Sequence, residues 1–474
     1  MKILFAASEA LPFIKVGGLG DVAGALPKAL VQKGHDVRVV VPLYSSMKQE
    51  LKEQLEYTKH FYFNFGWRSS YCGIFTAVVD GVTYYLIDNE QYFKRSAPYG
   101  EFDDGERFAY FSKAILEIIP QVDFFPDIIH ANDWHTALVP VYLDTQYRLI
   151  EGYGNIKTVF SIHNIEFQGK YGLDILENVF GIYKGQASLL EHDGCLNLMK
   201  GAIESSNAVT TVSRSYAQEI LNPYFSYGLD SILRQRQYKL SGIVNGIDVN
   251  LFDPATDKNI HTNYTAKTVN RNKRYNKRDL QRELGLAERD DIPLIGMVTR
   301  LTPQKGVDLL EQVVDELMQS DIQLVVLGTG YPDYENFMRY CEYKYHDKVR
   351  SCIMFSSALA QKIYAGADMF LMPSRTEPCG LAQMIALRYG TIPVVHSVGG
   401  LRDTVQPFEA ASGTGNGVTF QSFNAYDMLN AIYRSMEIWY DKNQLKTITH
   451  NAMSGDYSWN NSADEYIRIY ESIL

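Results

Sequence analysis

The sequence predicts an α/β protein built from two doubly wound domains, and three observations support this. Short apolar runs of strand length alternate with helix-length segments along the chain, which is the pattern of a parallel sheet covered by helices. The chain has 474 residues, too many for one ordinary core. A glycine-rich loop, Lys15-Val16-Gly17-Gly18-Leu19-Gly20, stands between an apolar run at residues 3–7 and a helical run at residues 23–33. Strand, glycine loop and helix in that order form an anion site in such sheets.

The expected elements divide the chain into two similar halves. Predicted strands of the first half are residues 3–7, 37–41, 74–79, 83–87, 128–131, 159–162, 208–212 and 242–244. Those of the second half are residues 293–299, 323–327, 353–355, 369–372 and 393–396, with helices at 307–318, 334–343, 358–365 and 381–388. We expect the two domains to face each other across a deep cleft lined by the carboxyl ends of their strands.

A polar stretch from Asp253 to about Arg278 follows a predicted turn at Asn245-Gly246. Between Lys267 and Arg278 it contains six lysines and arginines and no acid. We interpret this basic run as a solvated surface face or loop.

The glycine loop predicts a phosphate site. Glycines let the backbone approach an anion, a helix N-terminus offers free N–H groups, and Lys15 adds a positive charge. Gly18-x-Gly20-x-x-Ala23 also satisfies the loose dinucleotide-binding pattern. That pattern expects an acid at the end of the second strand, where this chain has Pro42-Leu43-Tyr44. The sequence therefore favours a substrate phosphate, with a dehydrogenase as the weaker alternative.

Composition argues against several kinds of partner. The chain is 46% hydrophobic and 21% charged, and its formal net charge of −10 argues against a nucleic-acid or anionic membrane surface.

Its five cysteines are scattered without paired spacing, so we expect a reducing compartment and no metal site. The first apolar run is too short for a signal peptide, and no apolar run is long enough to span a membrane, so we expect a cytoplasmic protein. The sequence indicates no oligomeric state.

Polar loops follow two predicted strands of the first half. Asn132-Asp133-Trp134-His135 follows residues 128–131, and His163-Asn164 follows residues 159–162. A single histidine is more often structural than catalytic, but two such loops at strand ends favour a site for sugar hydroxyls or proton transfer.

Charged loops also follow two predicted strands of the second half. Arg300 and Lys305 stand in one loop before a helix, where they suit a diphosphate whose charge grows as it leaves; two solvated surface cations are an equally good interpretation. Glu377 precedes another helix, either as a capping carboxylate or as part of a ligand site. Gly399-Gly400 opens a third helix.

Together these motifs closely resemble bacterial glycogen synthase and plant starch synthase over essentially the whole chain. The motifs, in order, are Lys15-x-Gly17-Gly18-Leu19, Asp133-Trp134-His135, His163-Asn164, Asn245-Gly246-Ile247-Asp248, Arg300-x4-Lys305-Gly306, Glu377-Pro378-Cys379-Gly380-Leu381 and Gly399-Gly400-Leu401. The resemblance implies the GT-B fold and retaining glucosyl transfer from ADP-glucose to an α-1,4-glucan. It also implies domains at residues 1–244 and 245–456, and a terminal helix at 457–474 that packs back on the first domain.

The resemblance further implies roles for individual residues. His163 would bond the donor glucose. Arg300 and Lys305 would neutralise the diphosphate, and Glu377 would hold the 3-hydroxyl side of the sugar. The remaining substrate contacts that it implies are Lys15, Gly17, Gly18, Asp21, Tyr99, Asp133, Asn164, Asn245, Phe355, Cys379, Gly380, Leu381 and Thr404. Among these, Tyr99 and Phe355 would contact the nucleotide.

The chain departs from the family pattern at Phe355, where Tyr is common, and at Ala382, where Thr is common. No loop offers a second carboxylate for double displacement. The sequence therefore favours a front-face substitution in which the leaving phosphate takes the acceptor's proton, without a metal or other cofactor. The alternatives are a related enzyme that uses UDP-glucose or makes sucrose, and a non-catalytic glucan-binding protein.

Overall fold

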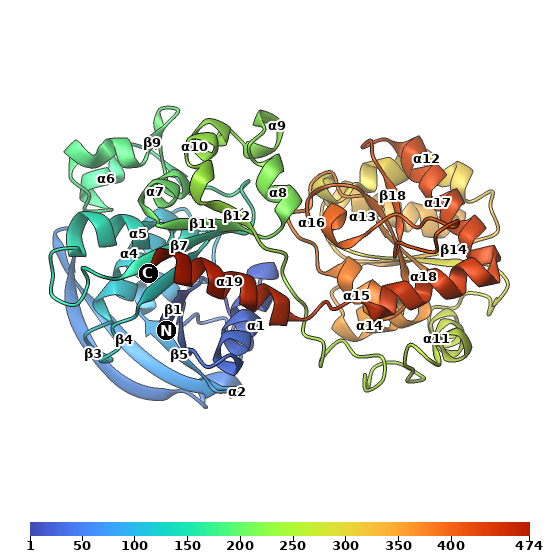
Figure 1. Cartoon of the computed structure of the whole chain (residues 1–474), viewed down its shortest axis with the longest axis horizontal. Coiled ribbons are helices and arrows are strands. Elements are labelled where there is room, and N and C mark those ends of the chain that lie inside the picture. Colours follow the sequence, from blue (N-terminus) through green and yellow to red (C-terminus); the bar gives the residue numbers. More distant parts are fainter. The chain divides into compact units, whose positions relative to one another are not determined.

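The computed structural model describes every residue from Met1 to Leu474 and contains two compact units (Figure 1). Unit 1 comprises Met1–Asn245 and Trp459–Leu474, and unit 2 comprises Gly246–Ser458. The boundaries expected from the sequence fall after residues 244 and 456, against 245 and 458 in the structure. Each unit is a sheet flanked by helices, so the α/β class is confirmed.

Unit 1 is built on a nine-stranded sheet with the order β12-β11-β7-β6-β1-β2-β5-β4-β3. In that order the strands are Leu240–Gly242, Ala208–Thr211, Lys157–Ile162, Ile128–Asn132, Lys2–Ala6, Asp36–Pro42, Val82–Asp88, Arg68–Val79 and Glu56–Phe65. Neighbours from β12 to β5 are parallel, whereas β4 pairs antiparallel with both β5 and β3. The edge strand β3 is absent from the sequence prediction, and so is a small sheet of β8 (Lys170–Tyr171), β10 (Cys195–Asn197) and β9 (Glu191–His192).

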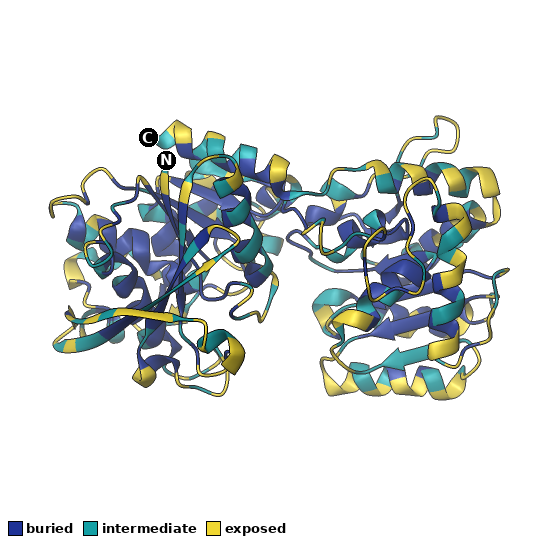
Figure 2. Ribbon diagram, turned by 90° about the horizontal axis from the view of Figure 1, so that it is seen from below, coloured by how far each residue is buried: buried dark blue, intermediate teal, exposed yellow.

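Helices flank the sheet of unit 1, and the central strands of that sheet are buried, as their dark blue colour in Figure 2 shows. They are α1 (Gly18–Gln32), α2 (Gln49–Lys52), α3 (Glu90–Phe93), α4 (Asp104–Glu117), α5 (Leu138–Tyr142), α6 (Ile175–Asn178), α7 (Leu198–Ser205), α8 (Arg214–Glu219), α9 (Pro223–Ser226), α10 (Asp230–Gln235) and α19 (Trp459–Ile473). Successive strands run outward from β1 to β2 on one side and to β6 on the other. The sheet therefore changes direction between β1 and β6, which is where doubly wound sheets bind ligands.

The last helix, α19, belongs to unit 1 although the chain reaches it only after unit 2. Its Trp459, Tyr466 and Tyr470 are buried in the same core as α1. The Tyr470 hydroxyl lies 2.7 Å from Nδ1 of His130, a fully buried residue of β6. A hydrogen bond thus joins the terminal helix α19 to β6, the strand that ends at Asn132.

Unit 2 is built on a six-stranded parallel sheet with the order β15-β14-β13-β16-β17-β18. In that order the strands are Val349–Cys352, Gln323–Leu327, Leu294–Val298, Met369–Met372, Ile392–His396 and Val418–Phe420. Its helices are α11 (Val269–Glu283), α12 (Val307–Leu317), α13 (Pro332–Lys344), α14 (Ser357–Gly366), α15 (Ala382–Arg388), α16 (Gly399–Thr404), α17 (Ala425–Tyr440) and α18 (Lys442–Ser454). This is the strand order 3-2-1-4-5-6 of a doubly wound domain, with the change of direction between β13 and β16.

One strand prediction in unit 2 is wrong. Residues 353–355 were expected to form a strand, but β15 ends at Cys352 and these residues belong to the following loop. The strand contains the polar Arg350 and Ser351, and the more apolar triplet after it is turned toward solvent, with Phe355 87% exposed.

The interpretation of the basic run as a solvated surface is wrong for Lys273. Its ammonium on α11 donates to the backbone oxygens of Tyr364, Ala365 and Tyr389 at 2.9 to 3.2 Å. It also donates to the Thr391 hydroxyl at 2.6 Å. Tyr364 and Ala365 lie in the last turn of α14, and Tyr389 directly follows α15. Lys273 therefore places a positive charge at the carboxyl ends of two helices, where it is favoured.

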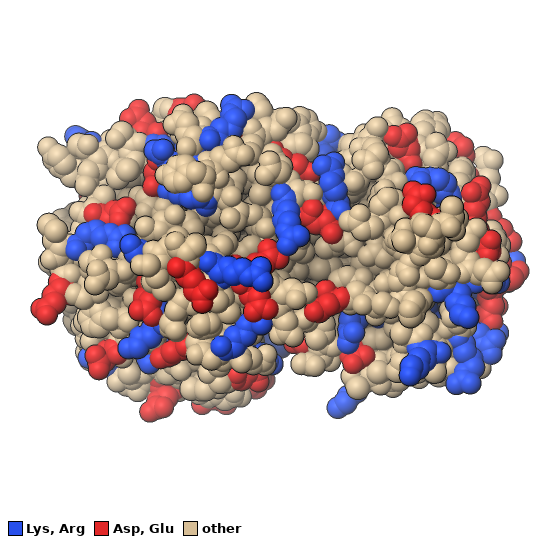
Figure 3. Space-filling view, viewed as in Figure 1, with Lys and Arg blue, Asp and Glu red and all other residues tan.

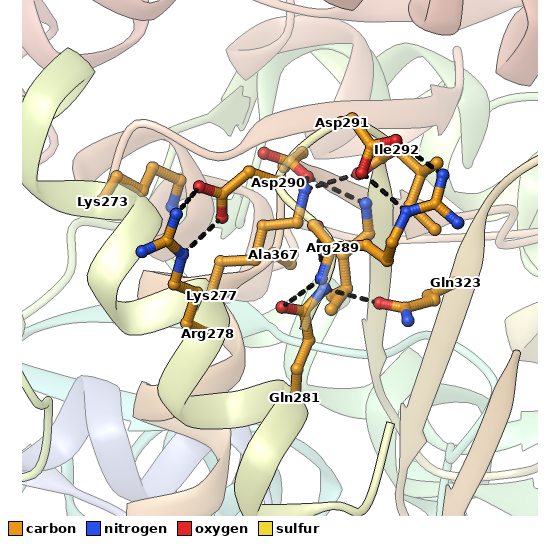
Figure 4. A network of polar contacts seen from close by, with 12 residues as sticks. Lys273, Lys277, Arg278, Gln281, Arg289, Asp290, Asp291, Ile292, Gln323 and Ala367 are labelled. Carbon is orange, nitrogen blue, oxygen red and sulfur yellow. Dashed lines mark hydrogen bonds and ion pairs between the residues drawn. The ribbon is translucent and has the colours of Figure 1, made fainter. Parts of the chain in front are cut away.

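A second lysine of the same helix, Lys277, is also buried, and its ammonium lies 2.7 Å from the Asp368 carboxylate. Figure 4 shows Lys277 beside Lys273. In the same view Arg278 pairs with Asp290, and Gln281 forms a hydrogen bond with Gln323. Helix α11 is thus joined to the rest of unit 2 by a polar network.

Replacing Lys273 by methionine keeps the aliphatic stem and removes the ammonium. We expect the free energy of unfolding to fall by about 2 to 3 kcal/mol, because four oxygens lose their donor. Arg271→Met on the exposed face of α11 is the matched control, with an expected change within about 0.5 kcal/mol. Urea unfolding followed by circular dichroism measures both, and equal stabilities would contradict the capping role.

Acidic and basic side chains are interspersed on the face in Figure 3, without a broad region of one sign. None of the helices reaches the length and apolar character that crossing a bilayer requires.

Candidate functional site

The glycine loop follows β1 in unit 1, and an unexpected carboxylate lies against it. Helix α1 begins at Gly18, with Gly17 at its N-cap. Glu9, only 2% exposed, accepts hydrogen bonds from the backbone N–H groups of Val16 and Gly17. One of the backbone donors predicted for a phosphate, the Gly17 N–H, therefore binds a side chain of the protein here, as does the neighbouring Val16 N–H.

The charged residues of the loop are paired with each other. The Lys15 ammonium lies 2.7 Å from the Asp21 carboxylate on α1, and both side chains are partly exposed. Burial raises the pKa of Asp21, and the neighbouring lysine opposes that shift. A Cβ atom at Gly18 would meet no atom within 4 Å, so Gly18 borders open space. An anion that approaches Gly18 would meet Lys15 and Asp21 together.

Glu9 also connects the loop to Tyr99 and His135. Burial raises the pKa of Glu9, whereas hydrogen bonds from Val16, Gly17 and Tyr99 lower it. The Tyr99 ring packs 4.7 Å from the His135 ring. Tyr99, expected to contact a nucleotide, thus lies among side chains of unit 1.

His163, in the loop after β7, is held in one orientation by Asn132 at the end of β6. The amide nitrogen of Asn132 donates to the backbone oxygens of Ala6 and His130, so its Oδ1 is the acceptor. His163 Nε2 lies 2.9 Å from that oxygen and must carry the proton. Nδ1 is then the acceptor nitrogen, and burial lowers the pKa of His163 to about 4. At neutral pH the site holds a neutral imidazole.

Asp133 fixes the backbone of the same loop. Its carboxylate accepts the His163 N–H at 2.7 Å, and its own backbone is left-handed with a φ of 55°. Burial raises the pKa of Asp133 to about 7, against the opposing effect of the backbone hydrogen bonds. Asn164 accepts the Glu166 N–H at 3.0 Å and so closes a turn. The two polar loops predicted from the sequence do meet.

His135 is a structural member of this group. Its ring stacks on Trp134 at 4.1 Å and contacts Phe108 at 4.6 Å, and neither ring nitrogen has a hydrogen-bond partner. Burial lowers the pKa of His135 to about 3, so the ring is neutral in the folded state.

Replacing His135 by phenylalanine is expected to stabilise the protein in acid. The folded-state pKa lies below the unfolded value, so this histidine destabilises the protein as pH falls from about 6.5 toward 3. At about pH 5 the variant should be more stable by on the order of 2 kcal/mol, and the gain should shrink at pH 7.5. Thermal unfolding at the two pH values measures this, and an equal gain at both would contradict the titration argument.

In unit 2, Lys305 and Glu377 come from the loops after β13 and β16, on either side of the change in direction. The Lys305 ammonium lies 2.6 Å from the Glu377 carboxylate, and these side chains are 17% and 7% exposed. The Ser374 hydroxyl donates to the same carboxylate oxygen at 2.9 Å. A Cβ atom at Gly306 would lie 2.0 Å from the Pro373 oxygen, so only glycine lets the two loops approach this closely.

Arg300 and Phe355 stand exposed at the ends of β13 and β15. The Arg300 guanidinium has no hydrogen bond or ion pair within the protein. The Phe355 ring is 87% exposed. An exposed guanidinium and an exposed ring suit a ligand with a phosphate and a flat base.

The loop that contains Cys379 and Gly380 is held by Gln383. Its amide nitrogen donates to the backbone oxygens of Cys379 and Gly380 and to the Thr404 hydroxyl, at 2.9 to 3.1 Å. A Cβ at Gly380, where φ is 73°, would collide with Gln383. Leu381 is the N-cap of α15. Thr404, expected to bind substrate, uses its hydroxyl to donate to Gly400.

The remaining predicted residue, Asn245, ends unit 1 with a buried side-chain oxygen that has no partner. Asn132 was expected only as part of the polar loop after residues 128–131, without a role of its own. Glu9 was not expected in the site, although it stands just after the end of a central strand, so the rule that located His163 and Lys305 also applies to it. No group of three or more His, Cys, Asp or Glu side chains has the geometry to hold a metal ion.

Comparisons with known proteins agree with this geometry. Residues 2–235 match the starch synthase catalytic domain family, and residues 279–452 match glycosyl transferases group 1. The chain is 51% identical to a glycogen synthase of Clostridium botulinum (strain Alaska E43), over all of this chain and 99% of that one. It is 48% identical to a glycogen synthase of Bacillus anthracis, over the full length of both.

Solved structures show the same fold. The catalytic domain of starch synthase IV from Arabidopsis thaliana, bound to ADP and acarbose, matches with a TM-score of 0.92 and 35% identity, over all of this chain and 99% of that one. Sucrose-phosphate synthase from Thermosynechococcus elongatus matches with a TM-score of 0.63 and 17% identity, over all of this chain and 98% of that one, a likeness in fold alone. The chain belongs to the glycogen synthase and starch synthase family of glycosyltransferases, and its fold is GT-B.

Proposed function

We propose that this protein is a glycogen synthase that transfers glucose from ADP-glucose to the non-reducing end of an α-1,4-glucan, with retention of configuration and release of ADP. The observation that carries the proposal is in unit 2. The Lys305 ammonium is held 2.6 Å from Glu377, and the unpartnered Arg300 guanidinium is presented by the same loop. Two cations at the change of strand direction suit a leaving diphosphate, and the full-length relatives support glucan synthesis.

The reaction follows from the state of Glu377. Lys305 and Ser374 both engage the same oxygen of its carboxylate, which makes it a poor nucleophile toward the sugar. The bond from the anomeric carbon to the β-phosphate oxygen breaks, and its electron pair leaves with ADP. The 4-hydroxyl oxygen of the acceptor bonds to the same face of that carbon, and its proton passes to the departing phosphate. Arg300 and Lys305 stabilise the charge that develops.

Unit 1 supplies hydroxyl recognition. The Nδ1 atom of His163 accepts a hydrogen bond from a donor sugar hydroxyl, because Nε2 is already committed to Asn132. Lys15 and the open backbone at Gly18 contact the sugar nucleotide. The exposed Phe355 ring of unit 2 stacks on adenine, which agrees with the ADP bound to the Arabidopsis relative.

We also propose that no metal is needed, since Arg300 and Lys305 neutralise the diphosphate. Activity should persist in excess EDTA, and its loss there would refute this part. All five cysteines are free thiols, in keeping with the cytoplasm as the proposed location.

The test uses glycogen with ADP-glucose or UDP-glucose labelled in the glucose. We expect label in polymer from ADP-glucose, one ADP released per glucose, and release of the label by β-amylase, which cleaves α-1,4 bonds from non-reducing ends. Label from UDP-glucose alone would overturn the donor assignment. Glycogen binding without ADP release would identify a non-catalytic glucan-binding protein.

A further inference from the structure

The last residue of β17, His396, is a buried histidine beside the loop that contains Glu377. The residue is 8% exposed. Its Nδ1 lies 2.7 Å from the backbone oxygen of Ser374, and its Nε2 lies 3.2 Å from that of Gln421. A backbone oxygen only accepts hydrogen bonds, so the ring acts on these segments as a donor.

The protonation of this ring decides which segment it holds. Burial lowers the pKa of His396, with a smaller effect of Arg402 and Arg375 in the same direction and an opposing effect of the two backbone hydrogen bonds. The ring is therefore neutral above about pH 7 and carries a single N–H. The shorter contact assigns that proton to Nδ1, so His396 donates to the backbone oxygen of Ser374.

Aromatic side chains fix the orientation of the imidazole. Its ring stacks on Phe420 of β18 at 5.3 Å and packs against Phe423 at 5.7 Å. The Phe423 ring in turn lies 4.1 Å from the Arg375 guanidinium. The direction of the Nδ1–H bond is thus set by packing within unit 2.

Ser374 connects His396 to Glu377. It is 2% exposed, and its hydroxyl donates to Oε2 of Glu377 at 2.9 Å. The Lys305 ammonium lies 2.6 Å from the same oxygen. The other carboxylate oxygen, Oε1, has no hydrogen bond or ion pair within the protein. Two donors therefore occupy one oxygen of Glu377 and leave the second free.

The free oxygen is suited to a sugar hydroxyl, because an ionised carboxylate only accepts hydrogen bonds. The group expected there is the 3-hydroxyl of the donor glucose. The terminal torsion of a glutamate side chain has broad energy wells, so Lys305 alone would not fix which oxygen of Glu377 stays free. The Ser374 hydroxyl adds the second point of attachment that fixes the carboxylate plane.

We propose that Ser374 and His396 are positioning residues that keep Oε1 of Glu377 directed at the 3-hydroxyl of the donor glucose. The proposal rests on the function proposed above, because that function supplies the donor. Both residues act through Glu377 and touch no reacting atom. Their effect is on the choice of donor sugar, since only a sugar with that hydroxyl gains from the aligned oxygen.

The test compares ADP-glucose with ADP-3-deoxyglucose as donors for the full-length protein, with glycogen as acceptor. The wild type should prefer ADP-glucose by about 10²-fold in kcat/KM, because the analogue leaves Oε1 unpaired. Ser374→Ala and His396→Phe should each lower that preference by about fivefold to tenfold, through a loss with ADP-glucose alone. His396→Asn places an amide N–H where Nδ1 stands and should restore most of the preference.

The control donor is ADP-2-deoxyglucose, which keeps the 3-hydroxyl, so its rate relative to ADP-glucose should not change in the variants. The control variant is His450→Phe, which removes an exposed histidine of α18 and should leave every ratio unchanged. Equal losses with all three donors would indicate a purely structural role and overturn the proposal, as would an unchanged preference in both variants.

Binding of the same donors without glucan, measured by isothermal titration calorimetry, gives the preference as a ratio of Kd values and needs no catalysis. A wild type that binds ADP-glucose but releases no ADP with glycogen would refute the proposed function. The Kd ratios of Ser374→Ala and His396→Phe would then still support or overturn the positioning role.

Discussion

Replacing Arg300 by alanine is expected to lower kcat/KM for glucosyl transfer by about 10²- to 10³-fold while leaving the stability of the protein unchanged. The loss in rate follows from the removal of one preorganised donor to the developing diphosphate charge. The unchanged stability follows from the position of the guanidinium, which is exposed and bonds to no protein group. Steady-state ADP release and thermal unfolding measure the two effects.

Replacing Lys305 by alanine should lower both kcat/KM for glucosyl transfer and the stability of the protein. Glu377 is 7% exposed and would keep only the Ser374 hydroxyl, so the free energy of unfolding should fall by about 1 to 3 kcal/mol along with a similar loss in kcat/KM. Lys344→Ala is the control, since Lys344 pairs with Asp315 on the exposed surface and its loss should alter neither quantity. Near-normal activity in Arg300→Ala would refute the diphosphate clamp.

Arg300 has no partner in the protein whereas Lys305 is paired, and this difference shows which part of the site the sequence can predict. Arg300, Lys305 and Glu377 follow strands of a parallel sheet, so their convergence at one edge follows from the alternation of strands and helices. The sequence does not indicate that Lys305 and Glu377 would pair with each other or that Arg300 would stay free. Those outcomes depend on the close approach of two loops at Gly306 and Pro373.

The features that the sequence does not predict correctly depend on contacts between segments that are far apart in the chain. The sequence pattern predicts a solvated cation at Lys273. Its acceptors at Tyr364 and Tyr389 are about a hundred residues away, and they are backbone oxygens, which no sequence pattern marks. The position of Glu9 just after a central strand marks it as a candidate, but its partners are backbone N–H groups of the glycine loop, which no sequence pattern marks. The edge strand β3 mixes exposed and buried residues without the continuous apolar run of a central strand.

Replacing His163 by alanine is expected to lower kcat by on the order of 10²-fold, because the donor sugar loses an acceptor aligned by the protein. Asn132 has no other role for its Oδ1 than to accept from Nε2 of this ring, so it decides which nitrogen faces outward. Asn132→Asp is the comparison variant. One of its carboxyl oxygens can still accept from Nε2, the other loses the hydrogen bonds to Ala6 and His130, and a buried charge there should raise the pKa of His163. Nitrogen NMR of the ring would show the protonation state in each form.

The pH dependence of the reaction separates His163 from Asp133. Burial lowers the pKa of His163 to about 4, so the ring stays neutral between about pH 5.5 and about pH 8 and adds no step to kcat/KM there. Burial raises the pKa of Asp133 to about 7, so its carboxyl ionises within that range. A step near pH 7 should therefore disappear in Asp133→Asn and persist, at lower activity, in His163→Ala. If the His163 variant removed the step instead, the imidazole would titrate near neutrality and could not serve as a permanently neutral acceptor for the sugar hydroxyl.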